Sequence, residues 1–183
     1  MRNAPTLDTA RLRLRPHRGD DFPAMHAMWA DPEVTRHISG IPSSENASWQ
    51  RSLRYAGHWA LLGYGYWLIE RRNDGAFVGE AGFADFRRTF DPPQPETARE
   101  PEAGWVLRAD MHGQGYAIEA LTRIFEWAET ETDWRSSFCI IAPEHAASLR
   151  LAGKLGFNPI ANIDLQGEVT LLRRSFDRPD LSA

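Results

Sequence analysis

The sequence predicts a mixed α/β fold, and three observations lead to this prediction. Residues 11–15 read RLRLR, a strict alternation that places Leu12 and Leu14 on one face of a half-buried strand. Two later segments flank an Asp-Gly turn and predict a hairpin, and other stretches repeat apolar residues at helical spacing. The strands and helices do not alternate regularly as in a doubly wound sheet, so we expect a mixed layered architecture.

The first half of the chain predicts a strand, two helices and a hairpin. We expect the three arginines of RLRLR on a solvated strand face, and a short helix that includes Pro23 in its first turn. A second helix is expected from Ser43 or Ser44 to about Leu62. Its apolar face is predicted to consist of Trp49, Leu53, Ala56 and Ala60. The segments YGYWLIERR and AFVGEAGFADF then form two strands around the turn residues NDG.

The second half begins with a proline-rich segment at residues 87–101, which predicts a loop that is either disordered or a lid on the substrate side. EAGWVLRAD predicts a short strand, residues 115–130 a helix, and SSFCIIA another strand. HAASLRLAGKLGF predicts a helix that ends at Gly156, and PIANIDLQ and EVTLLRRSF predict the last two strands.

The length and charge of the chain narrow the classes of protein to which it can belong. At 183 residues the chain fits one domain, residues 1–183. Its 21 Lys and Arg residues against 25 Asp and Glu residues give a net charge of -4, which lacks the basic excess of a nucleic-acid binder. We therefore expect no nucleic-acid partner.

Cysteine, hydropathy and histidine patterns exclude further classes. Cys139 is the only cysteine, so no intramolecular disulfide can form, and its apolar neighbours predict a buried core residue. The N-terminus lacks the apolar core of a signal peptide, and no apolar run is long enough for a membrane span, so we expect a cytoplasmic protein without a membrane partner. Several histidines lack the spacing of metal ligands, which predicts no metal site. They are His17, His26, His37 and His58.

The stretch HGQGYAIEA, residues 112–120, places two glycines between a strand and a helix and predicts a phosphate site. A P-loop is excluded because no glycine is followed at the right spacing by Gly-Lys-Ser/Thr. A dinucleotide fingerprint is excluded because Ile118 stands where its third glycine is needed. The remaining phosphate site is a loop whose backbone N–H groups and helix N-terminus bind a pyrophosphate, and its alternative is a plain tight turn.

Three separated motifs resemble one known family. EAGWVLRADMHGQGYAIEAL followed by PEHAASLRLAGKLGF resembles the core of the GNAT acetyltransferase superfamily, and LDTARLRLRPHRGDD resembles the opening of its RimJ/RimL-like branch. The resemblance extends from Leu7 to Phe176. It implies the GNAT fold, with a central, mostly antiparallel twisted sheet of about seven strands, splayed at an acetyl-CoA cleft, and about four helices packed on its faces.

The resemblance also implies where acetyl-CoA binds. The family pattern Q/R-x-x-G-x-G/A maps onto residues 112–117, and the pantetheine arm is expected along the backbone of residues 105–107. His112 replaces the usual Arg or Gln of this pattern, and His145 replaces the Asn of a later N-x-x-S motif. No metal is implied. The implied cofactor-binding residues are Trp105, Val106, Leu107, His112, Gly113, Gln114, Gly115, Tyr116, Ala117 and His145.

By the same resemblance, a primary amine attacks the acetyl carbonyl directly in a ternary complex. The candidate base is Glu102, at the start of the strand that precedes the cofactor loop, and the alternative is an exposed charge at a strand end. The candidate acid is Ser148, whose family counterpart lies near the thiolate sulfur, and the alternative is a first-turn serine bonded to the helix backbone. Glu119 is predicted to be a helix-start charge favoured by the helix dipole.

The acceptor stays open between three hypotheses. The RimJ/RimL-like resemblance favours the α-amine of a protein N-terminus. The alternatives are a small amine, such as an amino acid, a polyamine or an antibiotic, and a non-catalytic acyl-CoA-binding module. An open, acid-lined groove would favour a peptide and a closed aromatic pocket a small amine, and we expect the loop at residues 87–101 to decide between them. We expect a monomer or a homodimer.

Overall fold

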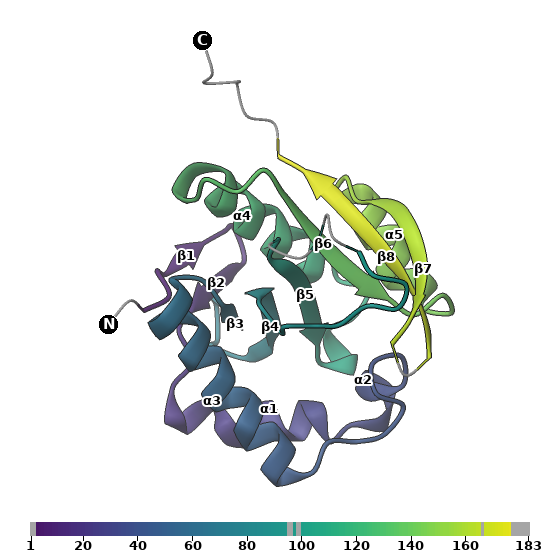
Figure 1. Cartoon of the computed structure of the whole chain (residues 1–183). Helices are drawn as coiled ribbons and strands as arrows, with labels where there is room; N and C mark the ends of the chain where they lie inside the picture. The colour runs from purple at the N-terminus through teal and green to yellow at the C-terminus, as the bar shows by residue number, and fades with distance from the viewer. Residues whose placement is uncertain (1–2, 95–96, 98–99, 166, 177–183) are drawn as a thin grey trace. The chain divides into compact units, whose positions relative to one another are not determined.

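The computed structural model describes residues 3–94, 97, 100–165 and 167–176 of the chain (Figure 1). The chain divides into two compact units, Met1–Ala84 with Gly104–Arg123 and Asp85–Ala103 with Ile124–Ala183. Strand β5 (Glu102–Leu107) and helix α4 (Tyr116–Glu131) contribute residues to both units. That residues 1–183 act as one domain stays a prediction.

The sheet of the first unit consists of antiparallel strands and the end of β5. Its order is β1 (Leu7–Asp8), β2 (Leu12–Arg15), β3 (Tyr66–Arg71), β4 (Phe77–Ala84) and then β5. Leu12 and Leu14 are fully buried, which confirms the alternation predicted from RLRLR. The predicted hairpin is also confirmed, with Gly75 in its turn at a φ of +69°.

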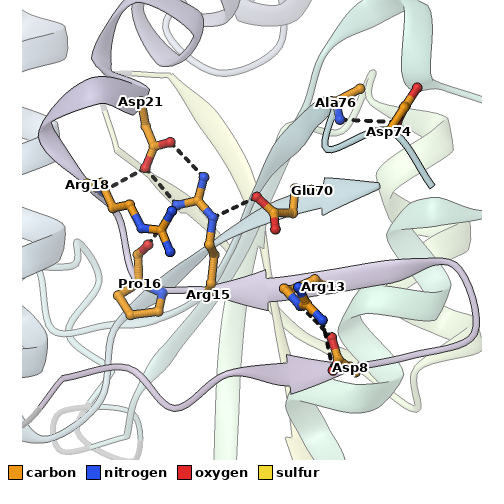
Figure 2. A network of polar contacts seen from close by, with 9 residues as sticks. All are labelled: Asp8, Arg13, Arg15, Pro16, Arg18, Asp21, Glu70, Asp74 and Ala76. Atoms are coloured by element: carbon orange, nitrogen blue, oxygen red, sulfur yellow. Dashed lines mark hydrogen bonds and ion pairs between the residues drawn. The ribbon is translucent and has the colours of Figure 1, made fainter. Parts of the chain in front are cut away.

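One arginine of RLRLR does not lie on a solvated face as predicted. Arg15 is buried, and its guanidinium donates to both carboxylate oxygens of Asp21, at 2.7 and 2.8 Å, and to Oε2 of Glu70 at 2.7 Å (Figure 2). A buried guanidinium is stable only when its charge and its N–H groups are compensated, and two carboxylates provide this compensation here. Arg13 is exposed as predicted and pairs with Asp8.

The helices of the first unit are α1 (Phe22–Trp29), the short α2 (Pro32–Thr35) and α3 (Glu45–Leu62), and the 3-10 turn η1 (Gly19–Asp21) precedes α1. Helices α1 and α3 lie side by side, and they contact β4 and β3 respectively (Figure 1). The side chain of Ser44 accepts a hydrogen bond from the backbone N–H of Ala47, and Gly63 ends α3 in the left-handed conformation. These two caps confirm the predicted limits of α3.

The buried face of α3 differs from the predicted one. Trp49 and Leu53 are 43% and 55% exposed. A second stripe on the same helix includes the buried aromatic residues Tyr55 and Trp59, and the indole of Trp59 donates to the backbone oxygen of Tyr66 at 2.9 Å. Both stripes have helical spacing, and the aromatic one is buried because it has more apolar area together with a partner for its polar atom.

The second unit has a sheet in which β6 (Ser136–Ile141) pairs with β8 (Glu168–Ser175), and β8 pairs with β7 (Asn158–Asp164), all antiparallel. The beginning of β5 pairs in parallel with β6 at Glu102 and Phe138. Cys139 of β6 is buried as predicted, and burial raises the pKa of its thiol. Helix α5 (Ala146–Lys154) is followed by Gly156 at a φ of +85°, which confirms the predicted end of this helix.

The loop at residues 87–101 is partly described. Phe90 packs in a buried cluster with Phe138, Ile163 and Leu171, and Asp91 forms an isolated antiparallel bridge with Asp164. Residues 95, 96, 98 and 99 of this loop, and Gln166 at the predicted end of the strand PIANIDLQ, lie outside the described residues. The prediction of a disordered loop or a lid is therefore not tested there.

The predicted class, a mixed α/β fold with a mostly antiparallel sheet, is confirmed. The sequence does not predict β1 or α2, because a strand of 2 residues and a helix of 4 residues are too short for a periodic pattern. Within the described ranges, no helix combines the length and the apolar composition needed to cross a membrane.

Candidate functional site

The loop between β5 and α4 has the geometry of a backbone anion site. It passes through the 3-10 turn η3 (Ala109–Met111) and then places Gly113 and Gly115 at φ values of +71° and +79°. A residue with a side chain adopts this left-handed conformation at a cost of about 1–2 kcal/mol. A Cβ on Gly113 would meet no atom within 4 Å, so the requirement for glycine at this position is conformational.

The backbone N–H groups of this loop remain available to a ligand. Tyr116 is the first residue of α4, and a helix leaves the N–H groups of its first turn without intrahelical acceptors. In the described part of the chain, no hydrogen bond uses the N–H groups of Gly113, Gln114 or Gly115. With the positive end of the helix dipole behind them, these groups fit the pyrophosphate of an acyl-CoA.

An ion pair ties the N-terminal segment to this loop. Oε1 of Glu119, in the first turn of α4, accepts hydrogen bonds from the hydroxyl of Thr9 and the backbone N–H of Arg11. Its Oε2 accepts from Nε of Arg11, and Nη1 of Arg11 donates to the backbone oxygen of Gln114 at 2.9 Å. Glu119 is thus a helix-start charge as predicted, and it also holds Arg11 against the loop, a role that no local sequence signal announces.

The hydrogen bonds of Glu119 change its ionisation. Burial acts to raise the pKa of this carboxyl, but the bonds from Thr9 and from the backbone and side chain of Arg11 outweigh it, so the pKa is lowered. Glu119 is therefore ionised at neutral pH. The guanidinium of Arg11 lies above the ring of Tyr116, with its Cζ 4.6 Å from the ring centre. It adds a positive charge beside the glycines of the loop.

Two of the predicted cofactor residues, His112 and Gln114, use their side chains to bind the backbone near the loop. Nε2 of His112 lies 3.0 Å from the backbone oxygen of Leu107, and the side-chain amide of Gln114 donates to the backbone oxygen of Asp110 at 2.8 Å. Both side chains therefore stabilise the loop itself. The first unit brings together all but one of the predicted cofactor residues, and they are Trp105, Val106, Leu107, His112, Gly113, Gln114, Gly115, Tyr116 and Ala117.

The remaining predicted residues belong to the second unit. Glu102 is buried rather than exposed at a strand end, and its two oxygens accept from Nε and Nη2 of Arg88 at 2.5 and 2.9 Å. A proton from a substrate must compete with this bidentate pair. Ser148 is buried in the first turn of α5, and His145 is the residue that precedes this helix. The roles of Glu102, Ser148 and His145 stay predictions.

A cavity of about 670 Å³ lies beside the same loop in the first unit. Among the lining residues, Arg108 and Asp110 form an ion pair at 2.7 Å and neutralise each other. The carboxylates of Asp31 and Glu33 then leave the lining with a net negative charge. The cavity is therefore acidic and has an apolar wall from α1. Its lining residues are Ala24, Ala27, Met28, Asp31, Glu33, Arg108, Ala109 and Asp110.

A family model described as an acetyltransferase (GNAT) domain matches residues 11–158, which include the loop and the ion pair that holds it. The chain belongs to the GNAT acetyltransferase family. The Bacillus subtilis protein YkkB, which is uncharacterised, is 29% identical over 163 residues, covering 85% of this chain and 87% of YkkB.

Solved structures of GNAT proteins share the fold. A protein from Bordetella pertussis, described as a GnaT-family acetyltransferase, is 28% identical with a TM-score of 0.83, covering 94% of this chain and 100% of the other. RimL, a ribosomal L7/L12 alpha-N-protein acetyltransferase in complex with coenzyme A, is 16% identical with a TM-score of 0.75, covering 94% of this chain and 99% of RimL.

Membership of the GNAT family makes this chain an acetyl-CoA-dependent acyltransferase that acts on an amine. The resemblance to the GNAT superfamily is thereby confirmed. In the ranges of the chain that the structure describes, no group of three or more His, Cys, Asp or Glu side chains is placed to hold a metal ion.

Proposed function

We propose that this GNAT enzyme acetylates the α-amine of a protein N-terminus. The acidic cavity beside the cofactor loop is the observation that supports this acceptor. Carboxylates attract a protonated amine or a basic peptide, and Asp31 and Glu33 supply this charge at the cavity wall. RimL, which shares the fold, acts on the N-terminus of a ribosomal protein.

The chain's own residues divide the work of binding the donor. The N–H groups of residues 113–117 bind the pyrophosphate, and the backbone of residues 105–107 binds the pantetheine arm and polarises the thioester carbonyl. Acetyl-CoA, when bound, supplies the acetyl thioester. Ser148 donates a proton to the departing thiolate, Glu102 is the base named by the resemblance, and His145 contacts the cofactor at the start of α5.

The acidity of the acceptor explains why an α-amine suits this site. An α-amino group has a pKa of about 7.7–8.0, so a large fraction is neutral near pH 7.5, whereas a lysine side chain with a pKa of about 10.4 is almost entirely protonated. Positioning of the reactants alone can lower the activation free energy by roughly 7–11 kcal/mol. An α-amine therefore needs only modest help from an acid or base on the protein.

A small amine is the second candidate, and the size of the cavity favours it. A volume of about 670 Å³ falls within the range of roughly 300–1,000 Å³ that is usual for small-molecule sites. An amino acid, a polyamine or an aminoglycoside would fit a cavity of this size and charge.

An assay of thiol release from acetyl-CoA tests these proposals on N-terminal peptides, amino acids, polyamines and aminoglycosides. We expect peptides with a free N-terminus to give the highest kcat/KM, and N-terminally blocked peptides that retain lysine to give none. Turnover of small amines alone would replace the first proposal by the second. Tight binding of acetyl-CoA without turnover across the panel would identify a non-catalytic acyl-CoA-binding module and overturn both.

The Glu33→Gln variant shows whether the cavity binds the acceptor. We expect it to raise KM for the acceptor and to leave the affinity for acetyl-CoA unchanged, because Glu33 lines the cavity and lies outside the cofactor loop. The exposed Glu45, at the first position of α3, provides a matched control in Glu45→Gln. If the two variants have the same KM for the acceptor, the cavity does not bind the acceptor.

A further inference from the structure

The first unit contains a buried carboxylate that does not belong to the cofactor loop. Glu80 of β4 is fully buried. Its Oε1 lies 2.8 Å from Nε2 of His17, and its Oε2 accepts a hydrogen bond from the indole of Trp29 at 2.8 Å. The side chain of His17 is 5% exposed, so both members of the pair are largely shielded from water. A carboxylate in this setting is stable because both of its oxygens have N–H partners.

The carboxylate determines which nitrogen of His17 carries the proton. A carboxylate accepts hydrogen bonds, so the neutral imidazole places its proton on Nε2 and leaves a lone pair on Nδ1. Among the described residues, Nδ1 of His17 has no hydrogen-bond partner. An imidazole that is oriented by a carboxylate and has a free ring nitrogen is the usual arrangement of a general base.

The backbone on both sides of His17 is held in place. Nη1 of Arg15 donates to the backbone oxygen of Pro16 at 3.0 Å, and Asp21 accepts from the backbone N–H of Arg18 at 2.6 Å. Figure 2 shows Arg15 between Asp21 and Glu70, with Pro16 and Arg18 on the same segment. This network holds the backbone on both sides of His17 in place.

The aromatic residues around His17 lead to strand β5. The ring of Tyr55 lies 5.3 Å from that of His17 and stacks on Tyr66 at 4.4 Å with an angle of 4° between the planes. A Cβ built on Gly104 would lie 1.8 Å from the hydroxyl of Tyr66, so this hydroxyl sits directly against the backbone of β5. Gly104 immediately precedes Trp105, where the proposed binding of the thioester arm begins.

From this arrangement we infer that His17 is the general base that takes the proton from the acceptor amine, with Glu80 as its positioning residue. The inference rests on the proposed function, because it requires an amine acceptor. The acceptor ammonium gives one proton to Nδ1 of His17 and becomes a neutral amine. Its nitrogen then forms the C–N bond, and the C–S bond of the thioester breaks with the electron pair on sulfur. Ser148, the proposed acid, gives its proton to that sulfur and regains one from the remaining surplus proton on nitrogen. The imidazolium returns its proton to water.

Kinetics of the whole protein with an acetylated amine from the panel test the inference. We expect His17→Gln to lower kcat about 100-fold at pH 7, the lower end of the range for a general base, and to leave the affinity for acetyl-CoA unchanged. The loss should shrink as the pH rises past the pKa of the amine, because the amine then arrives deprotonated. The titratable groups that face His17 are Glu80 of β4, Tyr55 of α3 and Asp21 of η1.

Two controls separate a base from a structural histidine. His26→Gln removes a histidine of α1 that forms a hydrogen bond with Ser48. If this variant has a lower kcat, we expect the decrease to be the same at neutral and alkaline pH. Glu102→Gln tests the competing base. If Glu102→Gln shows a loss that alkaline pH restores and His17→Gln does not, the inference is overturned. A His17→Gln loss that is equal at every pH would also overturn it.

A measurement without substrate keeps this test independent of the proposed function. Nitrogen-15 NMR of the free protein should show the neutral His17 ring protonated on Nε2, and Glu80→Gln should reduce this preference. A ring protonated on Nδ1 would overturn the inference, whatever the acceptor. Failure of every amine in the panel would instead refute the proposed function, and the tautomer would still decide whether His17 has the required lone pair.

Discussion

Nε of Arg11 donates a hydrogen bond to Oε2 of Glu119 at 2.6 Å, although 108 positions separate the two residues in the sequence. Arg11 also reaches the backbone oxygen of Gln114, so it connects the start of the chain to the cofactor loop and to the helix that follows. The order of this loop therefore depends on a segment that lies outside the acetyl-CoA motif.

Removing the charge of Glu119 should loosen the cofactor loop. Hydrogen bonds to a charged group contribute about 1.5–3 kcal/mol, and Glu119→Gln weakens three of them, so we expect a lower free energy of unfolding and weaker binding of acetyl-CoA. Urea unfolding and calorimetric titration measure the two effects. Glu129→Gln, which breaks an ion pair between α4 and Arg174, is the matched control and should leave the affinity for acetyl-CoA unchanged. Equal affinities in both variants would contradict the role of Glu119.

The same contact should depend on pH in a defined direction. The folded pKa of Glu119 is lowered, so its contribution to stability is fully present above the ordinary glutamate pKa of about 4.3 and is lost as the pH falls through the folded value. The difference in stability between the wild type and Glu119→Gln should therefore be constant from pH 7 to pH 5 and decrease below pH 4. Urea unfolding at a series of pH values measures this difference, and a difference that grows on acidification would contradict it.

Alanine at Gly115 should damage the loop through its backbone. The left-handed conformation costs a residue with a Cβ about 1–2 kcal/mol, and the new Cβ would lie 3.3 Å from Nη2 of Arg11. We expect Gly115→Ala to lower the stability and to weaken acetyl-CoA binding. Gly57, in the middle of α3 with no atom within 4 Å of its built Cβ, is the control, and Gly57→Ala should gain about 0.5–1 kcal/mol. Unchanged acetyl-CoA affinity in Gly115→Ala would remove the loop from cofactor binding.

Arg15 and Arg13 allow the same substitution to be compared at a buried and an exposed position of one strand. Arg15→Met leaves Asp21 and Glu70 without their buried partner, which should cost about 3–5 kcal/mol. Arg13→Met breaks an exposed pair with Asp8, which water screens, so its cost should be much smaller than that of Arg15→Met. Chemical unfolding measures the loss of unfolding free energy in each variant. Similar losses would show that the buried Arg15 contributes no more to stability than the exposed Arg13.

Ser148→Ala and Glu102→Gln test the acid and the base that the resemblance names. Each should lower kcat well beyond any change in the affinity for acetyl-CoA. Arg88→Gln breaks the same ion pair as Glu102→Gln but leaves the carboxylate, so it reports the structural part of the effect. Full activity in Ser148→Ala would remove this residue from the mechanism. Equal losses of kcat in Arg88→Gln and Glu102→Gln would assign Glu102 a structural role.

The parts of the fold that the sequence predicts correctly depend on local signals. Ser44 and Gly63 define the ends of α3 through a side-chain cap and a left-handed backbone, and both signals are contained within one helical turn. The alternation around Leu12 and Leu14 likewise identifies β2 from five consecutive residues. Such signals need no knowledge of the rest of the chain.

The parts that the sequence does not predict depend on partners that are distant in the chain. The burial of Arg15 requires Glu70, which lies 55 positions away, and the pairing of His17 requires Glu80, 63 positions away. Likewise, α3 has two apolar stripes, and only the packing against β3 decides that Trp59 is buried and Trp49 is not. These pairings cannot be predicted from a single sequence, because they depend on the fold.

The buried thiol of Cys139 has a practical consequence for measuring the reaction. Reagents that detect thiols react with the thiolate, and burial with a raised pKa keeps the one cysteine of the chain in its unreactive form. The native enzyme should therefore contribute no background to a chromogenic disulfide, and each mole of colour should correspond to one mole of coenzyme A. A slow rise of signal in the absence of acceptor and donor would instead count molecules whose β6 strand has opened, so the same cuvette can report both turnover and unfolding.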